Sequence, residues 1–177
     1  MKILSVFVCV WLVLQGLPAK AADRVLTDEE GKTVTLAATP SPDVFRYTNE
    51  RFGFSLDVSS LFAKILVIPD NGDGIILVDA TGEARLRASG GNRIDDTTLK
   101  RRFEAKRKEL GGAVAYSHLD KTFYVLSWME EEEIHYLKVI FGPSVWCDME
   151  LSYPAARKKE FDPIVTRSAN GFSLPKR

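Results

Sequence analysis

The chain has 177 residues, and its 24 Lys and Arg residues are balanced by 24 Asp and Glu residues, so the formal net charge is zero. This balance argues against a nucleic-acid-binding surface and against strong attraction to an anionic membrane. The length is typical of one domain with a sizeable hydrophobic core.

The N-terminal residues 1–21 have the features of a cleavable signal peptide. Lys2 precedes the apolar run Ile3–Leu14, and the small residues Ala19 and Ala21 follow one position apart, as a signal peptidase requires. The run is shorter than the roughly 20 residues that span a bilayer. We therefore expect cleavage after Ala21, a periplasmic or secreted protein, and no membrane span in the mature chain. An uncleaved N-terminal anchor is the alternative.

The rest of the chain divides into two parts. Residues 22–43 predict an N-terminal leader and connector, in which a short hairpin flanks the polar turn Asp28–Lys32. Residues 44–177 predict a single α+β domain. Apolar residues alternate with small or polar ones over 52–58, which predicts a half-buried strand, and further strands are predicted over 45–47, 65–68, 75–79 and 83–88.

One clear helix is expected from about Thr97 to Leu110, capped by Asp95 or Asp96 and ended by Gly111. Four further strands follow it, joined by short turns, over 113–119, 122–129, 133–141 and 145–153. Short hairpin links of this kind indicate an antiparallel sheet. A closing helix begins after Pro154, and a second helix start is predicted at Asp162 because a proline follows it. The fold class is therefore α+β, with helices packed on an antiparallel sheet.

Several motifs in this order resemble those of bacterial secreted domains of uncharacterised function with the PsbP/Mog-type α/β/α sandwich fold. They cover most of residues 45–173 and comprise Tyr47-x-Asn49-x-Arg51-Phe52-Gly53-Phe54-Ser55-Leu56-Asp57, Pro69-Asp70-Asn71-x-Asp73-Gly74, Tyr116 to Trp128, Tyr153-Pro154, Phe161-Asp162-Pro163-Ile164-Val165 and Gly171-Phe172. The resemblance implies a binding role, because members of this fold serve as an extrinsic photosynthetic subunit, a regulator of a nuclear GTPase and adaptors for secreted effectors. No functional residue set carries over by position.

Cysteine usage limits the chemistry. Cys9 lies within the expected signal peptide, which leaves Cys147 alone and excludes an intramolecular disulfide. Cys147 alternates with Val145, Met149 and Leu151 on one apolar strand face, which predicts a buried, inert thiol. A catalytic nucleophile, the alternative, needs a nearby base and some exposure.

Other candidate sites fail their templates. The turn Asp70–Gly74 lacks the glycine and glutamate that an EF-hand loop needs at positions 6 and 12. The acidic tip Glu130–Glu133 is expected to stay solvated rather than to collect a cation. His118 and His135 have no zinc-site spacing, and no G-x-S-x-G motif is present. We therefore expect no catalytic residue, no metal site and no cofactor.

Two features are candidates for partner binding. Lys100 and Arg101 belong to a basic helix face that is either simply solvated, with Glu104 as an ion-pair partner, or a docking surface for an acidic partner. Trp128 and Trp146 are the aromatic residues expected to line a groove on the outer sheet face.

These observations favour an exported, non-enzymatic domain that binds a protein or an envelope component. One alternative is a small periplasmic hydrolase-like enzyme, with a site assembled from His118, His135, Cys147 or the acidic tip. Another is an immunity or adaptor protein for a secreted toxin.

Overall fold

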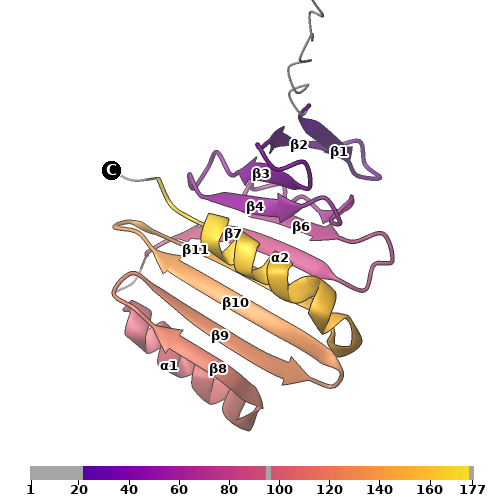
Figure 1. Cartoon of the computed structure of the whole chain (residues 1–177). Helices are drawn as coiled ribbons and strands as arrows, with labels where there is room; N and C mark the ends of the chain where they lie inside the picture. The colour runs from indigo at the N-terminus through magenta and orange to yellow at the C-terminus, as the bar shows by residue number, and fades with distance from the viewer. Residues whose placement is uncertain (1–21, 95–96, 176–177) are drawn as a thin grey trace, which may run out of the picture.

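The computed structural model describes residues 22–94 and 97–175 (Figure 1). The expected signal peptide and its cleavage after Ala21 lie outside these ranges and remain predictions. Within the described ranges, no helix has the length and apolar character needed to cross a membrane.

The strands form two antiparallel sheets. The smaller sheet has the order β1 (Arg24–Thr27), β2 (Thr33–Ala38), β3 (Val44–Thr48), β4 (Ser55–Ser59). The larger sheet has the order β5 (Lys64–Val67), β6 (Gly74–Val78), β7 (Arg85–Asn92), β11 (Val145–Pro154), β10 (Glu133–Phe141), β9 (Phe123–Glu130), β8 (Val114–Leu119). The four strands expected after the first helix form in chain order, and β11 then pairs with β7 to join the two halves of the larger sheet.

The two helices lie on opposite faces of the seven-stranded sheet. Figure 1 shows α1 (Leu99–Leu110) behind β8 and β9, whereas α2 (Lys158–Gly171) and the four-stranded sheet lie in front. The result is a layered α+β domain with helices packed on an antiparallel sheet, which confirms the fold class expected from the sequence.

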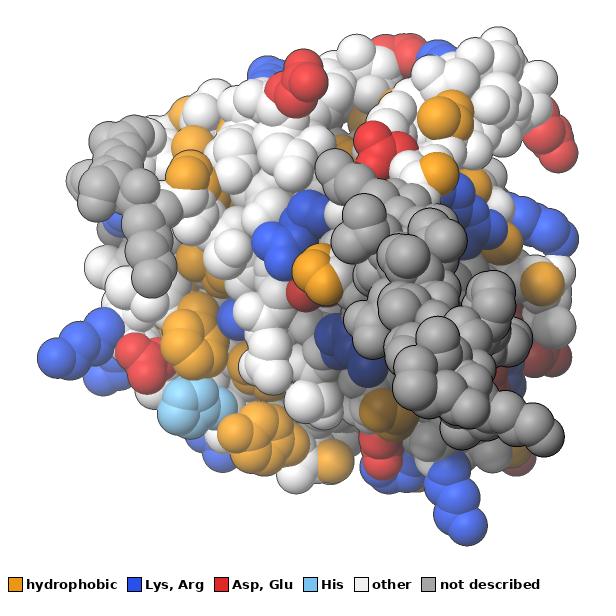
Figure 2. All heavy atoms as spheres, turned by 45° about the horizontal axis from the view of Figure 1, so that its top comes forward, with side chains coloured by type: hydrophobic (Ala, Val, Ile, Leu, Met, Phe, Trp, Pro, Cys, Tyr) orange, Lys and Arg blue, Asp and Glu red, His pale blue; other side chains and the backbone are white. Residues whose placement is uncertain are grey.

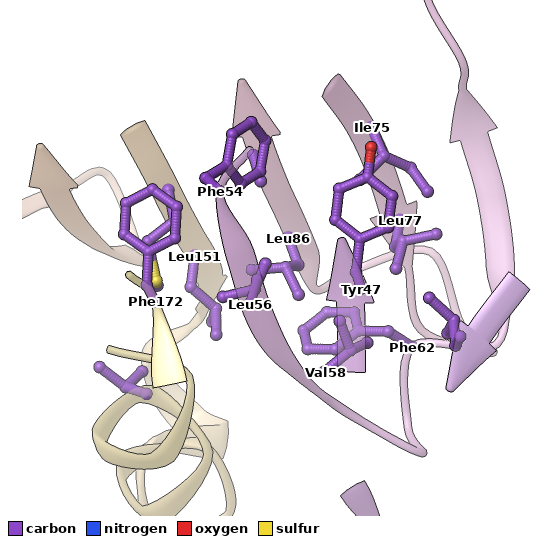
Figure 3. Packing of buried hydrophobic residues seen from close by; sticks show 14 of the residues in the cluster. Tyr47, Phe54, Leu56, Val58, Phe62, Ile75, Leu77, Leu86, Leu151 and Phe172 are labelled. Carbon is purple, nitrogen blue, oxygen red and sulfur yellow. The ribbon is translucent and has the colours of Figure 1, made fainter. Parts of the chain in front are cut away.

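The main hydrophobic core fills the space between the two sheets and α2. Figure 3 shows how the buried side chains of β3, β4, β6 and β7 converge there with Phe172. Leu26 and Leu36 of the expected hairpin belong to the same cluster. Residues 24–38 therefore contribute to the hydrophobic core, and Ala37 and Ala38 pair with β3.

Helix α1 packs its apolar stripe on a second, smaller cluster. Leu99 and Phe103, four residues apart, are the buried residues of the helix, and Phe103 contacts the ring of Tyr124 at 5.6 Å between centroids. The helix ends where Gly111 adopts φ 55°, as the sequence predicts. The cap is different, however. Thr98 accepts from the backbone N–H of Arg101, whereas the expected caps Asp95 and Asp96 lie outside the described residues.

Helix α2 is continuous where the sequence predicts two separate helix starts. The sequence predicts a second helix start at Asp162, but the helix continues through Pro163 without interruption. The proline removes one backbone hydrogen bond. Burial of Phe161 and Val165 and a hydrogen bond from the Ser168 hydroxyl to the Asp57 carbonyl (2.7 Å) nevertheless hold the helix on β4.

Both outermost strands of the larger sheet are irregular. The β5–β6 register shifts between Ile65 and Val67. The β8–β9 register shifts between Val114 and Tyr116. Such bulges bend and twist the strand that carries them.

Candidate binding groove beside helix α1

A row of charged side chains lies on the α1 face of the large sheet, beyond the part that the helix covers. Asp148 and Glu150 alternate along β11 with the buried Cys147 and Met149, so they project to the opposite face from the core. The register pairs Glu150 with Arg87 of β7. The fold thus places two carboxylates beside a guanidinium on a sheet face.

The row is tightly connected. Arg87 lies 3.3 Å from Asp148 and 3.0 Å from Glu150, measured between guanidinium nitrogen and carboxylate oxygen. Ser89 donates its hydroxyl to Asp148 at 2.6 Å. His135 of β10 extends the row, because its Nδ1 lies 3.3 Å from Glu150 Oε1. These contacts run across three adjacent strands.

The pKa values of Glu150, His135 and Arg87 shift toward the charged forms. Burial alone would raise the pKa of Glu150, but the hydrogen bond from His135 and the charge of Arg87 outweigh it and lower that pKa. The hydrogen bond to Glu150 raises the pKa of His135 despite its partial burial. Burial likewise opposes the charge of Arg87, and the two carboxylates more than offset it, so the Arg87 pKa is raised.

A groove of about 320 Å³ lies between this row and α1, and we call it the α1 groove. Arg87, Asp148 and Glu150 form its floor, and Arg102 and Lys106 reach into it from the helix. Its charged side chains are three basic and three acidic residues, the third acid being Glu109. The groove therefore offers fixed donors and acceptors of both signs.

Aromatic side chains complete the lining. The guanidinium of Arg102 lies 4.1 Å from the ring centroid of Trp146, a cation–π contact at the end of the groove. Tyr124 also lines the groove, and burial raises its pKa to about 12, so its hydroxyl is a neutral donor at neutral pH.

Of the two tryptophans predicted to line a groove, the structure places only Trp146 in it. Trp128 is 5% exposed and packs in the smaller core cluster under α1. Its ring stacks on His135, Lys106 lies over it at 5.7 Å, and its Nε1 has no hydrogen-bond acceptor among the described residues. Trp128 supports the groove from beside it.

The other two predicted residues lie on the helix surface, outside the groove lining. Lys100 is exposed and its Nζ lies 3.8 Å from Glu104 Oε1, the i,i+4 pair that the sequence indicates. Arg101 is exposed as well. The helix meets the groove through Arg102 and Lys106 instead, one turn apart on a neighbouring stripe.

The residues of the hydrolase alternative are dispersed. Cys147 is fully buried on the opposite face of the sheet, and burial raises its pKa to about 12. His118 pairs with Val125 of β9, whereas His135 pairs with Trp128 of the same strand, so a strand and three register positions separate the two histidines. Only His135 meets the acidic tip, with Nε2 at 3.5 Å from Glu133.

The acidic turns are engaged by cations of the protein. Asp70 lies 2.6 Å from Lys32, and Asp73 lies 2.7 Å from Arg51. Within the described part of the chain, no three His, Cys, Asp or Glu side chains are grouped as a metal site requires. On the face seen in Figure 2, blue and red side chains are interspersed among neutral ones, in line with the balanced composition.

No protein-family model matches the chain, and no curated protein matches it in sequence. A solved structure does match in fold: the solution structure of cyanobacterial PsbP (CyanoP) from Synechocystis sp. PCC 6803, at 13% identity and a TM-score of 0.56. The match covers 78% of this chain and 96% of that one. The chain has a PsbP-like fold. At 13% identity the likeness concerns the architecture alone and assigns no role to the α1 groove.

The residues of the groove floor were not predicted from the sequence, although the sequence contains a pattern that indicates them. Charged residues alternate with apolar ones at Arg85 and Arg87 and again at Asp148 and Glu150. Each pattern alone describes an ordinary solvated strand face. Only the pairing of β7 with β11, which are separated by more than 50 residues, turns them into one row.

Proposed function

We propose that the protein is an exported binding domain that uses the α1 groove to hold a protein partner. The observation that carries the proposal is the charged row of Arg87, Asp148, Glu150 and His135 on a sheet face that α1 leaves uncovered. A network fixed across three strands presents its donors and acceptors in a set geometry, which reduces the ordering cost of binding.

The chemistry of the groove favours a protein surface as the partner. Arginine, tryptophan and tyrosine side chains are enriched among the residues that dominate binding energy at protein interfaces. Arg102, Trp146 and Tyr124 bring these types together. The equal number of acidic and basic groups suits a partner segment of mixed charge better than a polyanion.

Site-specific photo-crosslinking in the native host tests this proposal. A benzophenone amino acid at Arg85, which is exposed on the same sheet face, samples the groove side. The same label at Lys159, exposed on α2, samples the opposite side. We expect a discrete protein adduct from position 85 and none of the same mass from position 159.

Variants sharpen the result. Trp146→Ala and Arg102→Ala should reduce the position-85 adduct at least tenfold, whereas Lys100→Ala, outside the groove on the same helix, should leave it intact. Thermal unfolding of each variant confirms that it is folded. An adduct that forms equally from both positions, or that ignores the groove variants, would contradict the proposal.

A further inference from the structure

A second pocket lies on the other face of the large sheet, at the end remote from the acidic tip. It has a volume of about 630 Å³, within the range of small-molecule sites. The β10–β11 turn at Gly142–Ser144 forms one wall, and the segment after α2, from Phe172 to Pro175, forms another. We call it the Lys138 pocket, after the ammonium group that lines it.

The remaining walls are largely apolar. Phe123 and Ile140 come from neighbouring strands, and Leu174 comes from the C-terminal segment. All three side chains are partly exposed, so the pocket presents apolar surface to solvent at the end of the core. A ligand with an apolar body would cover it.

Lys138 supplies the polar feature. Its Nζ donates to the carbonyl oxygen of Ala169 at 2.6 Å and to that of Phe172 at 3.3 Å. An ammonium group has three N–H donors. No further acceptor and no carboxylate within 4 Å of Lys138 is found among the described residues, which leaves one donor for a ligand.

The positive charge is only partly compensated. The two carbonyls belong to the C-terminal end of α2, where the helix dipole amounts to about half a negative charge. The ring of Phe123, 5.2 Å away, adds a weak cation–π attraction. Arg51, at the rim, already pairs with Asp73. A half-buried cation without an acidic partner attracts an anion more strongly than an exposed lysine does, because solvent screens it less.

We propose that the Lys138 pocket binds a small free monocarboxylate with an apolar body, whose carboxylate pairs with Lys138 and whose body covers Phe123, Ile140 and Leu174. A medium-chain fatty acid is the simplest member of this class. The pocket lies on the opposite sheet face from the α1 groove, so failure of one proposal leaves the other unaffected.

Titration with decanoate, followed by amide chemical shifts of the full mature chain, tests this inference. We expect saturable shifts at Ile140, Gly142 and Leu174, with the α1 groove unaffected. The neutral analogue 1-decanol, which has the same apolar length, should bind at least tenfold more weakly. Equal affinity for acid and alcohol, shifts centred elsewhere, or no saturable binding of decanoate would overturn the proposal.

Two pocket variants, Lys138→Met and Leu174→Trp, separate the contribution of the lysine charge from that of the pocket shape, and Lys159→Met is the control. Lys138→Met should lower decanoate affinity at least tenfold and leave 1-decanol affinity unchanged, whereas Lys159→Met removes an exposed lysine elsewhere and should change neither. Loss of the Lys138 cap on α2 weakens the fold as well. Leu174→Trp therefore serves as an independent variant that fills the pocket with Lys138 intact, and it should weaken both ligands. Wild-type affinity for decanoate in both pocket variants would overturn the assignment.

Discussion

Trp128 and His135 stack face to face on adjacent strands, with ring centroids 4.8 Å apart and planes inclined by 4°. The same imidazole contacts Glu150 through Nδ1 and Glu133 through Nε2. The histidine thus joins the α1 groove, the acidic tip and the core beneath α1.

This position predicts a pH-dependent stability. The hydrogen bond to Glu150 raises the pKa of His135 above the 6.5 of an ordinary histidine. The stabilisation is therefore complete below pH 6.5 and is lost as the pH rises through the folded-state pKa, with each unit of elevation equivalent to about 1.4 kcal/mol. Urea unfolding below pH 6.5 and again above the folded-state pKa should show this fall in the free energy of unfolding. It should flatten in His135→Gln and persist in His118→Gln; the opposite pattern would show that His118 is responsible.

The stability of the fold should depend strongly on Arg157, because this residue is the ion-pair partner of the buried Asp79. The Asp79 side chain is 4% exposed and lies 2.6 Å from Arg157. Replacing Arg157 with alanine leaves that carboxylate without its cation, at a cost of about 1–3 kcal/mol, less than for a fully buried pair because the guanidinium is itself partly exposed.

Chemical denaturation measures this cost. The control is Lys158→Ala, which breaks an exposed pair with Asp162 on the same helix and should cost less than about 0.5 kcal/mol. Equal losses in the two variants would refute the importance of the buried carboxylate. Asp79→Asn combined with Arg157→Ala should recover part of the lost stability.

Cys147 should be chemically silent in the folded protein. It is fully buried, and burial raises its pKa to about 12, so the reactive thiolate is scarce and inaccessible at pH 8. An aromatic disulfide reagent should label it rapidly in urea and only at the rate of unfolding in buffer. Fast labelling of the folded chain would reveal an accessible thiol and revive the hydrolase alternative.

Two glycines should differ sharply in their tolerance of a methyl group. A Cβ at Gly74 would lie 1.9 Å from the Ala88 carbonyl oxygen on β7, whereas a Cβ at Gly112 would meet nothing within 4 Å. Gly74→Ala should therefore cost at least about 1–3 kcal/mol of unfolding free energy through overpacking. Gly112→Ala should stay within about 0.5 kcal/mol of wild type. Similar melting temperatures for the two variants would contradict the close approach of β6 to β7.

The sequence predicted what depends on neighbouring residues. The strands β8 to β11 fall within one residue of their expected bounds, because alternation and short turns are local signals. The end of α1 at Gly111 is local in the same sense. The cap residue Thr98 was missed because acidic residues and threonine compete for the same capping role.

What depends on distant residues was not predicted. Trp128 and Trp146 both lie on strands rich in aromatic residues, yet one is buried under α1 and the other lines the groove. The position of α1 decides between them, and nothing local to either tryptophan reports it. The Lys138 pocket depends likewise on the C-terminal segment, which returns to pair Ser173 with Ser55.

The irregular outer strands β5 and β8 bear on self-association. An edge strand offers free N–H and C=O groups to any strand that approaches it, which is how sheets of separate molecules join into fibrils. A bulge puts part of that edge out of step with a straight incoming strand. With one register shift at each end of the seven-stranded sheet, a straight strand from another copy would meet an edge that is partly out of step, which disfavours edge-to-edge pairing.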